Sequence, residues 1–393
     1  MRWERVAVAQ VAQINPRPDA DDRPEASERV SFVPMASVSE LTLSIERPEE
    51  RMYADVAKGF TQFKRGDMIV AKITPCFENG KMARADGLPH RFGVGSTEFH
   101  VLRPSHQLDG GYLFHMLRAP WVRRAGAMKM KGAAGQRRVP AEFFAELEIP
   151  LPPLAEQKRI AGILDAADAL RAKRREALAQ LDALLQSTFL DMFGDPVTNP
   201  MGWARSRIGD LGDVITGNTP ARKCSEYYGD AIEWIKSDNI NDPSFTLTNA
   251  EEGLSQQGRR IARIAPKGSV LVTCIAGSRS CIGNAAIADR EVAFNQQINA
   301  FVPGKRILLW YAFGIFLMGK DLVQRASTNS MKGMVSKSAF AGITVTLPPL
   351  DLQHRFAAIV ESAEQQKARM RAHLAELDAL FASLQSRAFS GTL

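Results

Sequence analysis

Two turns that follow predicted strands carry side chains able to hydrogen-bond the edges of DNA bases. The first reads Thr-Pro-Cys-Phe-Glu-Asn-Gly-Lys over residues 74–81, and the second reads Gly-Ser-Arg-Ser-Cys-Ile-Gly-Asn over residues 277–284. A third polar cluster, Phe-Asn-Gln-Gln, occupies residues 294–297. Arg, Asn, Gln and Lys are the residue types that recognise base edges. The turns therefore suggest that the protein recognises a DNA base sequence. For any one of these residues taken alone, unconstrained variation of a loop sequence is a sufficient explanation.

Two stretches without acidic residues could contact phosphates. Residues 110–141 hold seven basic residues and no acid, and residues 322–350 hold three basic residues and no acid. Phosphate contacts set affinity and register on DNA but carry no sequence information. The basic residues of the two stretches are Arg118, Arg123, Arg124, Lys129, Lys131, Arg137 and Arg138, then Arg325, Lys332 and Lys337. A basic run is often only a solvated face, but two such runs at matching places favour a polyanion.

These turns and stretches select one set of candidate residues for contact with double-stranded DNA. An excess of 50 Lys and Arg over 43 Asp and Glu, a formal net charge of +7, agrees with a polyanionic partner. The candidates are Lys72, Thr74, Asn79, Lys81, Lys129, Lys131, Gln136, Arg137, Arg138, Lys236, Ser278, Arg279, Asn284, Asn295, Gln296, Lys332 and Lys337.

Catalytic patterns are incomplete along the whole sequence. Residues 242–245 read Asp-Pro-Ser-Phe, which lacks the second proline of an amino-methyltransferase loop, and no cofactor loop precedes them. There is no GxxxxGK[ST] phosphate loop, and Glu-Trp-Ile-Lys at 233–236 has the wrong spacing for a nuclease pair. The six histidines are scattered, and the four cysteines have no CxxC spacing. We therefore expect a non-catalytic chain without a metal or cofactor of its own, and with buried free thiols.

The chain contains an internal repeat. Residues Leu151–Ser187 and Leu347–Ser383 align without a gap at an offset of 196, and 18 of the 37 pairs are identical, including Leu-Pro-Pro-Leu and Leu-Asp-Ala-Leu. The intervening segments repeat more weakly at offsets of about 199 to 202, as in 65–70 against 267–272. A 393-residue chain that is 45% hydrophobic can bury more than one core. The expected domains are 1–150, 151–198, 199–346 and 347–393.

The two well-matched segments are each predicted to form one long amphipathic helix. Apolar residues recur every three or four positions, a prolyl pair precedes each helix, and Gly-Asp-Pro at 194–196 ends the first. A helix of about 36 residues is roughly 54 Å long and needs a comparable partner. The twins are therefore expected to pair as an antiparallel coiled coil, which relates the attached globular regions by a pseudo-two-fold axis like that of duplex DNA. A coiled coil that serves only for oligomerisation is the alternative.

The two globular regions are predicted to be mixed α/β (α+β) domains. Strands are expected at 68–73, 99–102, 269–275 and 298–302, and one helix in each region at 111–126 and 308–325. The N-terminus lacks the hydrophobic core of a signal peptide, and the longest apolar run, 307–318, is too short to span a bilayer. A cytoplasmic location is expected.

The sequence at 151–160, Leu-Pro-Pro-Leu-Ala-Glu-Gln-Lys-Arg-Ile, closes a variable region and opens a long helix. It resembles the conserved-region signature of type I restriction-modification specificity subunits, and residues 132–139 and 209–215 are similar to their target-recognition domains. The copy at 347–359 departs from the signature, with Leu352 and His354 in place of Glu156 and Lys158.

This resemblance covers essentially the whole chain and implies two target-recognition domains, each reading half of a split target. It implies two adenine-methyltransferase subunits that bind S-adenosylmethionine, and endonuclease/translocase subunits that use ATP and Mg²⁺, as partners in defence against foreign DNA. Three alternatives stay open: a related system whose nuclease and methylase are fused in one partner, a non-catalytic coiled-coil scaffold with incidental basic patches, and a stand-alone methyltransferase. The missing cofactor loop disfavours the last.

Overall fold

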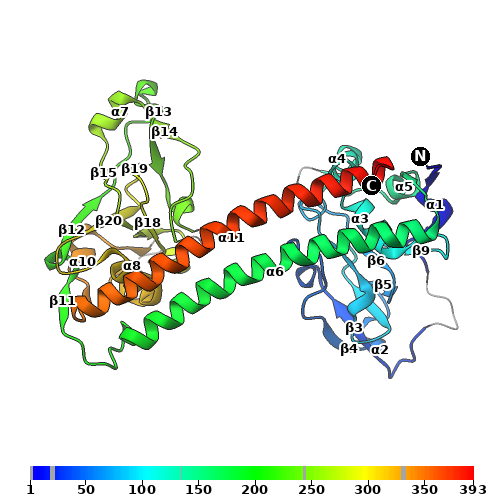
Figure 1. The fold of residues 1–393 in the computed structure, drawn as a ribbon, viewed down its shortest axis with the longest axis horizontal. Coiled ribbons are helices and arrows are strands. Elements are labelled where there is room, and N and C mark those ends of the chain that lie inside the picture. Colours follow the sequence, from blue (N-terminus) through cyan, green and yellow to red (C-terminus); the bar gives the residue numbers. More distant parts are fainter. Residues whose placement is uncertain (1–2, 18–22, 134, 242–244, 329–332) are drawn as a thin grey trace. The chain divides into compact units, whose positions relative to one another are not determined.

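The computed structural model describes residues 3–17, 23–133, 135–241, 245–328 and 333–393. The chain divides into two compact units: unit 1 comprises Met1–Glu176 and Ala372–Leu393, and unit 2 comprises Ala177–Arg371. Each unit holds one globular region and one half of each of two long helices (Figure 1).

The globular region of unit 1 contains two four-stranded sheets and one strand pair. The first sheet, all antiparallel, has the order β2-β9-β6-β7: Ala12–Ile14, Phe99–Pro104, Met68–Ala71 and Met82–Arg84. The second has the order β4-β3-β8-β5, with β3 and β8 parallel: Glu49–Met52, Arg29–Val33, Phe92–Gly95 and Thr61–Lys64. The remaining pair is β1 with β10: Arg5–Ala7 and Glu148–Pro150.

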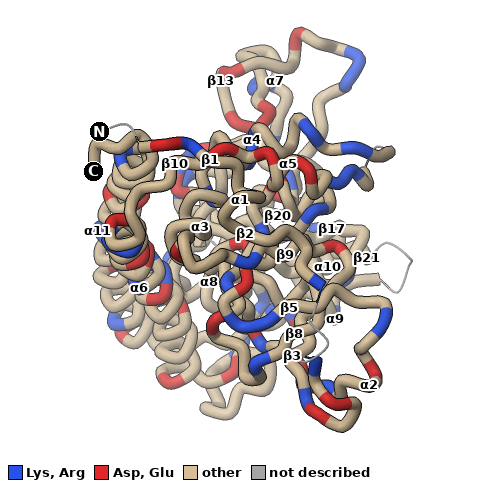
Figure 2. Tube along the Cα trace, turned by 90° about the vertical axis from the view of Figure 1, so that its right-hand side faces the viewer, with Lys and Arg blue, Asp and Glu red and all other residues tan. Residues whose placement is uncertain are grey.

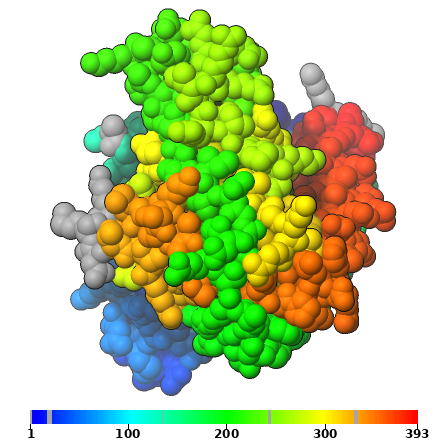
Figure 3. Space-filling model, turned by 90° about the vertical axis from the view of Figure 1, so that its left-hand side faces the viewer, coloured from blue at the N-terminus to red at the C-terminus, as the bar shows by residue number. Residues whose placement is uncertain are grey.

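Unit 2 repeats both four-stranded sheets and the strand pair of unit 1 in the same order. Its first sheet has the order β12-β20-β16-β18: Gly212–Thr216, Ile298–Pro303, Val270–Thr273 and Ala285–Ile287. Its second has the order β14-β13-β19-β15, again with one parallel pair, β13 and β19: Gly253–Leu254, Tyr228–Ile235, Val292–Phe294 and Ile264–Ala265. Two strand pairs remain in this unit: β11 with β22, Arg205–Arg207 and Thr344–Thr346, and β17 with β21, Ile275–Ala276 and Gly333–Met334. Figure 3 shows this unit from the side where the segment after α6, in green, lies beside the segment that leads into α11, in orange. The faint repeat between the variable segments is therefore a repeat of fold.

The single helix expected in each globular region is two helices. In unit 1, α3 (Gly110–Leu117) ends before Pro120, which lacks an amide hydrogen and begins α4 (Pro120–Lys129). In unit 2, Gly319 separates α8 (Leu309–Met318) from α9 (Lys320–Arg325). The other short helices are α1 (Val8–Val11), α2 (Tyr53–Val56), α5 (Ala141–Ala145), α7 (Gln256–Ile261) and α10 (Lys337–Ala341).

The long helices are α6 (Leu154–Phe193) and α11 (Leu350–Ser390), with both signs of charge along them (Figure 2). In unit 1, Arg159 of α6 contacts the Leu393 carbonyl, whereas Arg171 contacts Asp378. Because one residue number rises while the other falls, the helices run antiparallel, as predicted. Gly194, with φ of +72°, follows the last residue of α6.

Equivalent glutamines attach the start of each long helix to its globular region. Gln157 Oε1 accepts from the Asp109 amide at 2.8 Å, and its Nε2 donates to the Pro152 carbonyl at 2.9 Å. Gln353 makes the same pattern with the Leu308 amide at 2.9 Å and the Pro348 carbonyl at 2.9 Å. Both side chains are buried, so the glutamine retained in the two sequence copies anchors the helix.

Candidate nucleic-acid interface

Two segments that are far apart in the sequence form one surface in unit 1. The Thr74 amide donates to the Arg137 carbonyl at 2.9 Å, and the Val139 amide donates to the Lys72 carbonyl at 2.8 Å. Lys131 and Arg138 form a bridge that closes the 131–138 loop. The turn after β6 and the basic loop, predicted separately, therefore lie side by side.

The same arrangement occurs in unit 2. Strand β17 (Ile275–Ala276) pairs with β21 (Gly333–Met334), and the Val335 amide donates to the Cys274 carbonyl at 2.9 Å. Because the two strands are antiparallel, the 277–284 turn lies at the Gly333 end of β21, and its Ile282 side chain packs close to Gly333. Lys332, one of the candidate residues, lies outside the described residues, as does the 242–244 part of the Asp-Pro-Ser-Phe segment.

Acids from other parts of the chain neutralise several cations of the first basic stretch. Arg138 pairs with Glu98 at 2.8 Å, and Arg137 lies 3.5 Å from Glu78. The hydrogen bond from Arg138 lowers the pKa of Glu98, despite the opposing effect of its partial burial. Lys129 and Lys131 are exposed and have no ion-pair partner among the described residues. The charges of these two lysines are therefore available to a phosphate.

Arg118, which the acid-free stretch suggested as a phosphate contact, faces the interior. Its side chain is only 10% exposed and pairs with Asp168 of α6 at 2.6 Å. Its guanidinium lies 5.1 Å from the ring centroids of both Phe114 and Phe381. Burial raises the pKa of Asp168, but the hydrogen bond and charge of Arg118 outweigh it and bring the pKa below its usual value. An acid-free stretch of sequence is therefore not acid-free in space.

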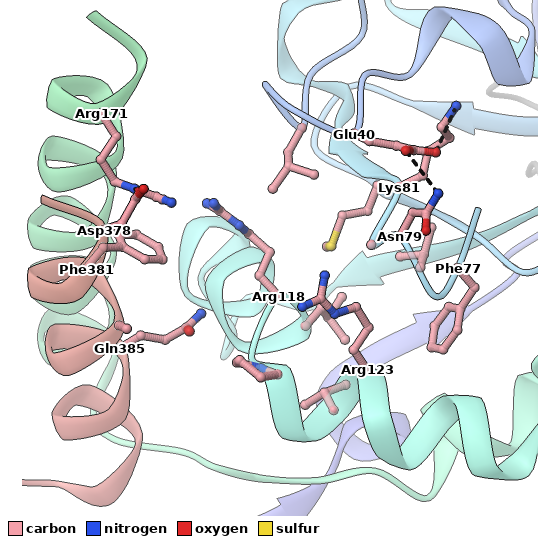
Figure 4. A pocket seen from close by; sticks show the side chains of 18 of the residues that line it. Glu40, Phe77, Asn79, Lys81, Arg118, Arg123, Arg171, Asp378, Phe381 and Gln385 are labelled. Atoms are coloured by element: carbon pink, nitrogen blue, oxygen red, sulfur yellow. Dashed lines mark hydrogen bonds and ion pairs between the residues drawn. The ribbon is translucent and has the colours of Figure 1, made fainter. Parts of the chain in front are cut away.

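Asn79 and Lys81 line a cavity of about 280 Å³ in unit 1 (Figure 4). Asn79 Nδ2 donates to Glu40 at 3.2 Å, and Lys81 Nζ lies 3.6 Å from the same carboxylate. Both candidates therefore hold the turn against the loop that carries Glu40. Thr74 similarly donates to Glu78 at 2.9 Å.

The unit 2 candidates divide into exposed and structural residues. Ser278, Arg279, Gln296 and Lys337 are exposed. The structural residues make internal contacts: Asn295 is buried and donates to Gln297 at 3.0 Å, Lys236 pairs with Glu252 at 2.6 Å, and Asn284 bonds Asn241 and Lys320.

Two exposed apolar side chains lie close to Lys129 and Lys131, and they are not among the candidate contacts predicted from the sequence. Trp121 and Met128 of α4 are 38% and 82% exposed, and Trp121 lines the same hollow as Lys129 and Lys131, a hollow that Glu142, Glu146 and Glu148 also line. Large apolar residues within a basic stretch were the signal available in the sequence, since an exposed aromatic ring next to cations suits a nucleic acid.

Other kinds of site find little support in the described residues. Among them, no group of three or more His, Cys, Asp and Glu side chains is placed to hold a metal ion. No helix in the described parts of the chain is both long and apolar enough to cross a membrane. All four cysteines are free thiols, but only Cys274 is buried, and burial raises its pKa to about 12.

Comparison with known proteins supplies the family. The family model described as type I restriction modification DNA specificity domain matches residues 2–180 and 200–379. The specificity subunits of the type I restriction enzymes EcoAI and EcoEI from Escherichia coli are 43% and 41% identical to this chain over 159 and 161 residues. These matches cover 40% and 41% of this chain but 26% and 27% of the relatives, so the chain spans about a quarter of their length.

Longer matches are weaker. A putative type I restriction enzyme MjaX specificity subunit from Methanocaldococcus jannaschii is 22% identical over 312 residues, which is 74% of this chain and 70% of that protein. A chain of a type I R-M system has a TM-score of 0.57 at 21% identity, covering 100% of this chain and 98% of that one. The S subunit of a type I system from M. genitalium has a TM-score of 0.56 at 14% identity, with coverages of 98% and 96%. The fold is shared with both.

Proposed function

Because the chain belongs to the type I restriction modification DNA specificity domain family, we propose that it is the DNA-reading subunit of a type I restriction-modification complex. Each globular region contacts one half of a split target, and the long helices set the distance between the halves. This is a binding role without catalysis in this chain.

The observation that carries the proposal is the repeat of one scaffold with two different reading surfaces. The strand order of unit 1 recurs in unit 2, and in each unit a turn after the central strand is joined to a second loop. The turns themselves differ, with Asn79 and Lys81 in one and Ser278 and Arg279 in the other. Two domains with the same fold but different residues in their turns are suited to bind two half-sites of different sequence.

Exposed cations of the two acid-free stretches supply the sequence-independent part of binding. Lys129 and Lys131 in unit 1 and Lys337 in unit 2 are exposed and have no ion-pair partner among the described residues. Neutralising phosphates with such cations releases counterions, so the affinity falls as salt rises. Because the reading residues contribute hydrogen bonds to bases, sequence selectivity falls less steeply with salt than affinity does.

The chemistry of the complex belongs to partner chains in this proposal. Two adenine-methyltransferase subunits with S-adenosylmethionine modify the target, and endonuclease/translocase subunits with ATP and Mg²⁺ cleave DNA. No phosphate loop is present in the sequence of this chain, and its methyltransferase-like segment lacks the second proline. The family match disfavours a coiled-coil scaffold with incidental basic patches.

Selection from a randomised duplex pool at moderate salt tests the proposal. We expect the full chain to enrich a split motif with a constant spacer, whereas featureless binding would support a scaffold. Purification of the chain with its bound partners distinguishes separate methyltransferase and endonuclease subunits from one fused partner. Transfer of a labelled methyl group by the isolated chain would contradict the non-catalytic role.

A further inference from the structure

In unit 1, a basic side chain is enclosed between the two long helices. Arg171 of α6 is 15% exposed, and its Nε lies 2.5 Å from Oδ1 of Asp378 of α11. The same guanidinium lies 2.6 Å from Asp168, one turn earlier in α6. It also lies 4.5 Å from the ring centroid of Phe381 (Figure 4). One cation therefore bridges a carboxylate of its own helix and a carboxylate of the other.

Unit 2 has the same arrangement with the helices exchanged. Lys367 of α11 is only 1% exposed and forms an ion pair with Asp182 of α6. Its Nζ lies 2.5 Å from Glu364, one turn earlier in α11, and 4.2 Å from the ring centroid of Phe245. The Lys367 side chain is therefore as completely buried as the Asp67 carboxylate, which is also 1% exposed in its pair with Arg103.

These residues occupy equivalent positions of the internal repeat. At the offset of 196, Arg171 corresponds to Lys367, and Asp182 corresponds to Asp378. In each copy the aspartate follows the cation by eleven residues, which is close to three helical turns and places both on one face. Each helix therefore presents a cation and a carboxylate of this pattern to its partner, and Arg175 of α6 adds a second contact to Asp378 at 3.2 Å.

This pattern selects the antiparallel direction. When the helices run antiparallel, Arg171 meets Asp378 while Lys367 meets Asp182, so both pairs form at once. If the equivalent positions were aligned in parallel, cation would face cation and aspartate would face aspartate. A shift of one heptad in the antiparallel pairing would separate Lys367 from Asp182 and leave Glu364 of its own helix as its carboxylate partner, and the loss of one partner from a buried ion pair is unfavourable.

We propose that these two ion pairs, Arg171 with Asp378 and Lys367 with Asp182, set the direction and register in which the long helices pair. We call them the interlock. The inference rests on the proposed function, because the register then sets the spacer of the split target. Apolar residues of similar volume often stabilise a buried position as well as an ion pair does, so the role of such pairs is to exclude wrong registers.

Charge exchange within unit 2 tests the interlock. Lys367→Asp and Asp182→Lys each place like charges together, and the full chain carrying either one should enrich targets with more than one spacer length. Specific binding should also fall about tenfold. The double variant restores an ion pair with its two charges exchanged between the helices. It should return to one spacer and to binding within about threefold of the native chain. A double variant no better than the weaker single variant would overturn the proposal.

A second variant covers the case in which the single variants do not fold. Lys367→Met with Asp182→Leu removes both charges, so the chain should keep its helix content and melting temperature while accepting several spacers. One unchanged spacer in this folded variant would also overturn the proposal. Lys173→Asp, an equal change of charge at an exposed position of α6, is the matched control and should leave the spacer unchanged. Failure of the native chain to select any split motif would refute the proposed function instead.

Discussion

Replacement of Gln157 with Leu should loosen the start of α6 from the globular region of unit 1. The glutamine side chain is buried and makes three hydrogen bonds, to the Asp109 amide at 2.8 Å, the Gln107 carbonyl at 3.0 Å and the Pro152 carbonyl at 2.9 Å. Leucine has a similar volume and makes none of them. At about 1 kcal/mol for each bond, the local free energy of opening should fall by about 3 kcal/mol.

Native-state hydrogen exchange read by mass spectrometry measures this loss locally. A change of about 3 kcal/mol should lower protection by about a hundredfold in peptides that cover residues 107–117 and 152–164. Gln353→Leu should produce the equivalent loss in peptides that cover 306–316 and 348–360, since Gln353 makes the matching bonds. Gln136→Leu, the same chemical change at an exposed site, should have no effect on either set.

A decrease in protection below about twofold for Gln157→Leu would refute this reasoning. It would mean that the helix is held by its apolar contacts alone, and that the glutamine retained in both copies does not anchor it. An equal loss of protection in the Gln136→Leu control would mean that the effect is unspecific.

Four further predictions address binding, pH dependence, thiol reactivity and domain independence. Replacing both Lys129 and Lys131 with Ala should weaken binding to all DNA sequences and reduce the slope of log affinity against log salt by about one for each lysine, as measured by anisotropy; an unchanged slope would exclude phosphate contacts by both. Burial lowers the pKa of His115, so below about pH 6.5 this histidine binds a proton more readily in the unfolded chain than in folded unit 1. The hydrogen-exchange protection of unit 1 should therefore fall as pH falls, and it should fall less steeply in the His115→Gln variant. Cys274, with its pKa raised to about 12, should react with iodoacetamide only after unfolding, and rapid labelling of the native chain would contradict its burial. Exchange of residues 201–346 for those of a relative should change one half of the selected motif, and a change in both halves would show that the two readers are not independent.

Sequence periodicity and repetition were sufficient for the large elements. The 196-residue offset and the three-and-four spacing of apolar residues predicted both long helices, because a continuous apolar stripe over about ten turns has few other ways to be buried. The same comparison indicated two equivalent globular regions. The sequence did not show that α3 and α4 are separate helices, since Pro120 can either kink a helix or begin a new one.

Whether a charged side chain is paired and buried or free and exposed depended on contacts between residues distant in the chain. Arg118 and Lys131 belong to the same acid-free stretch, yet Arg118 is buried against Asp168, fifty residues away, whereas Lys131 is exposed. The spacing of Arg171 and Asp182 within one helix was visible in the sequence, but their partners were not. The local sequence determines which side chains share a helix face. Only tertiary packing decides which opposite charge meets them, because that depends on the direction and register of the neighbouring element.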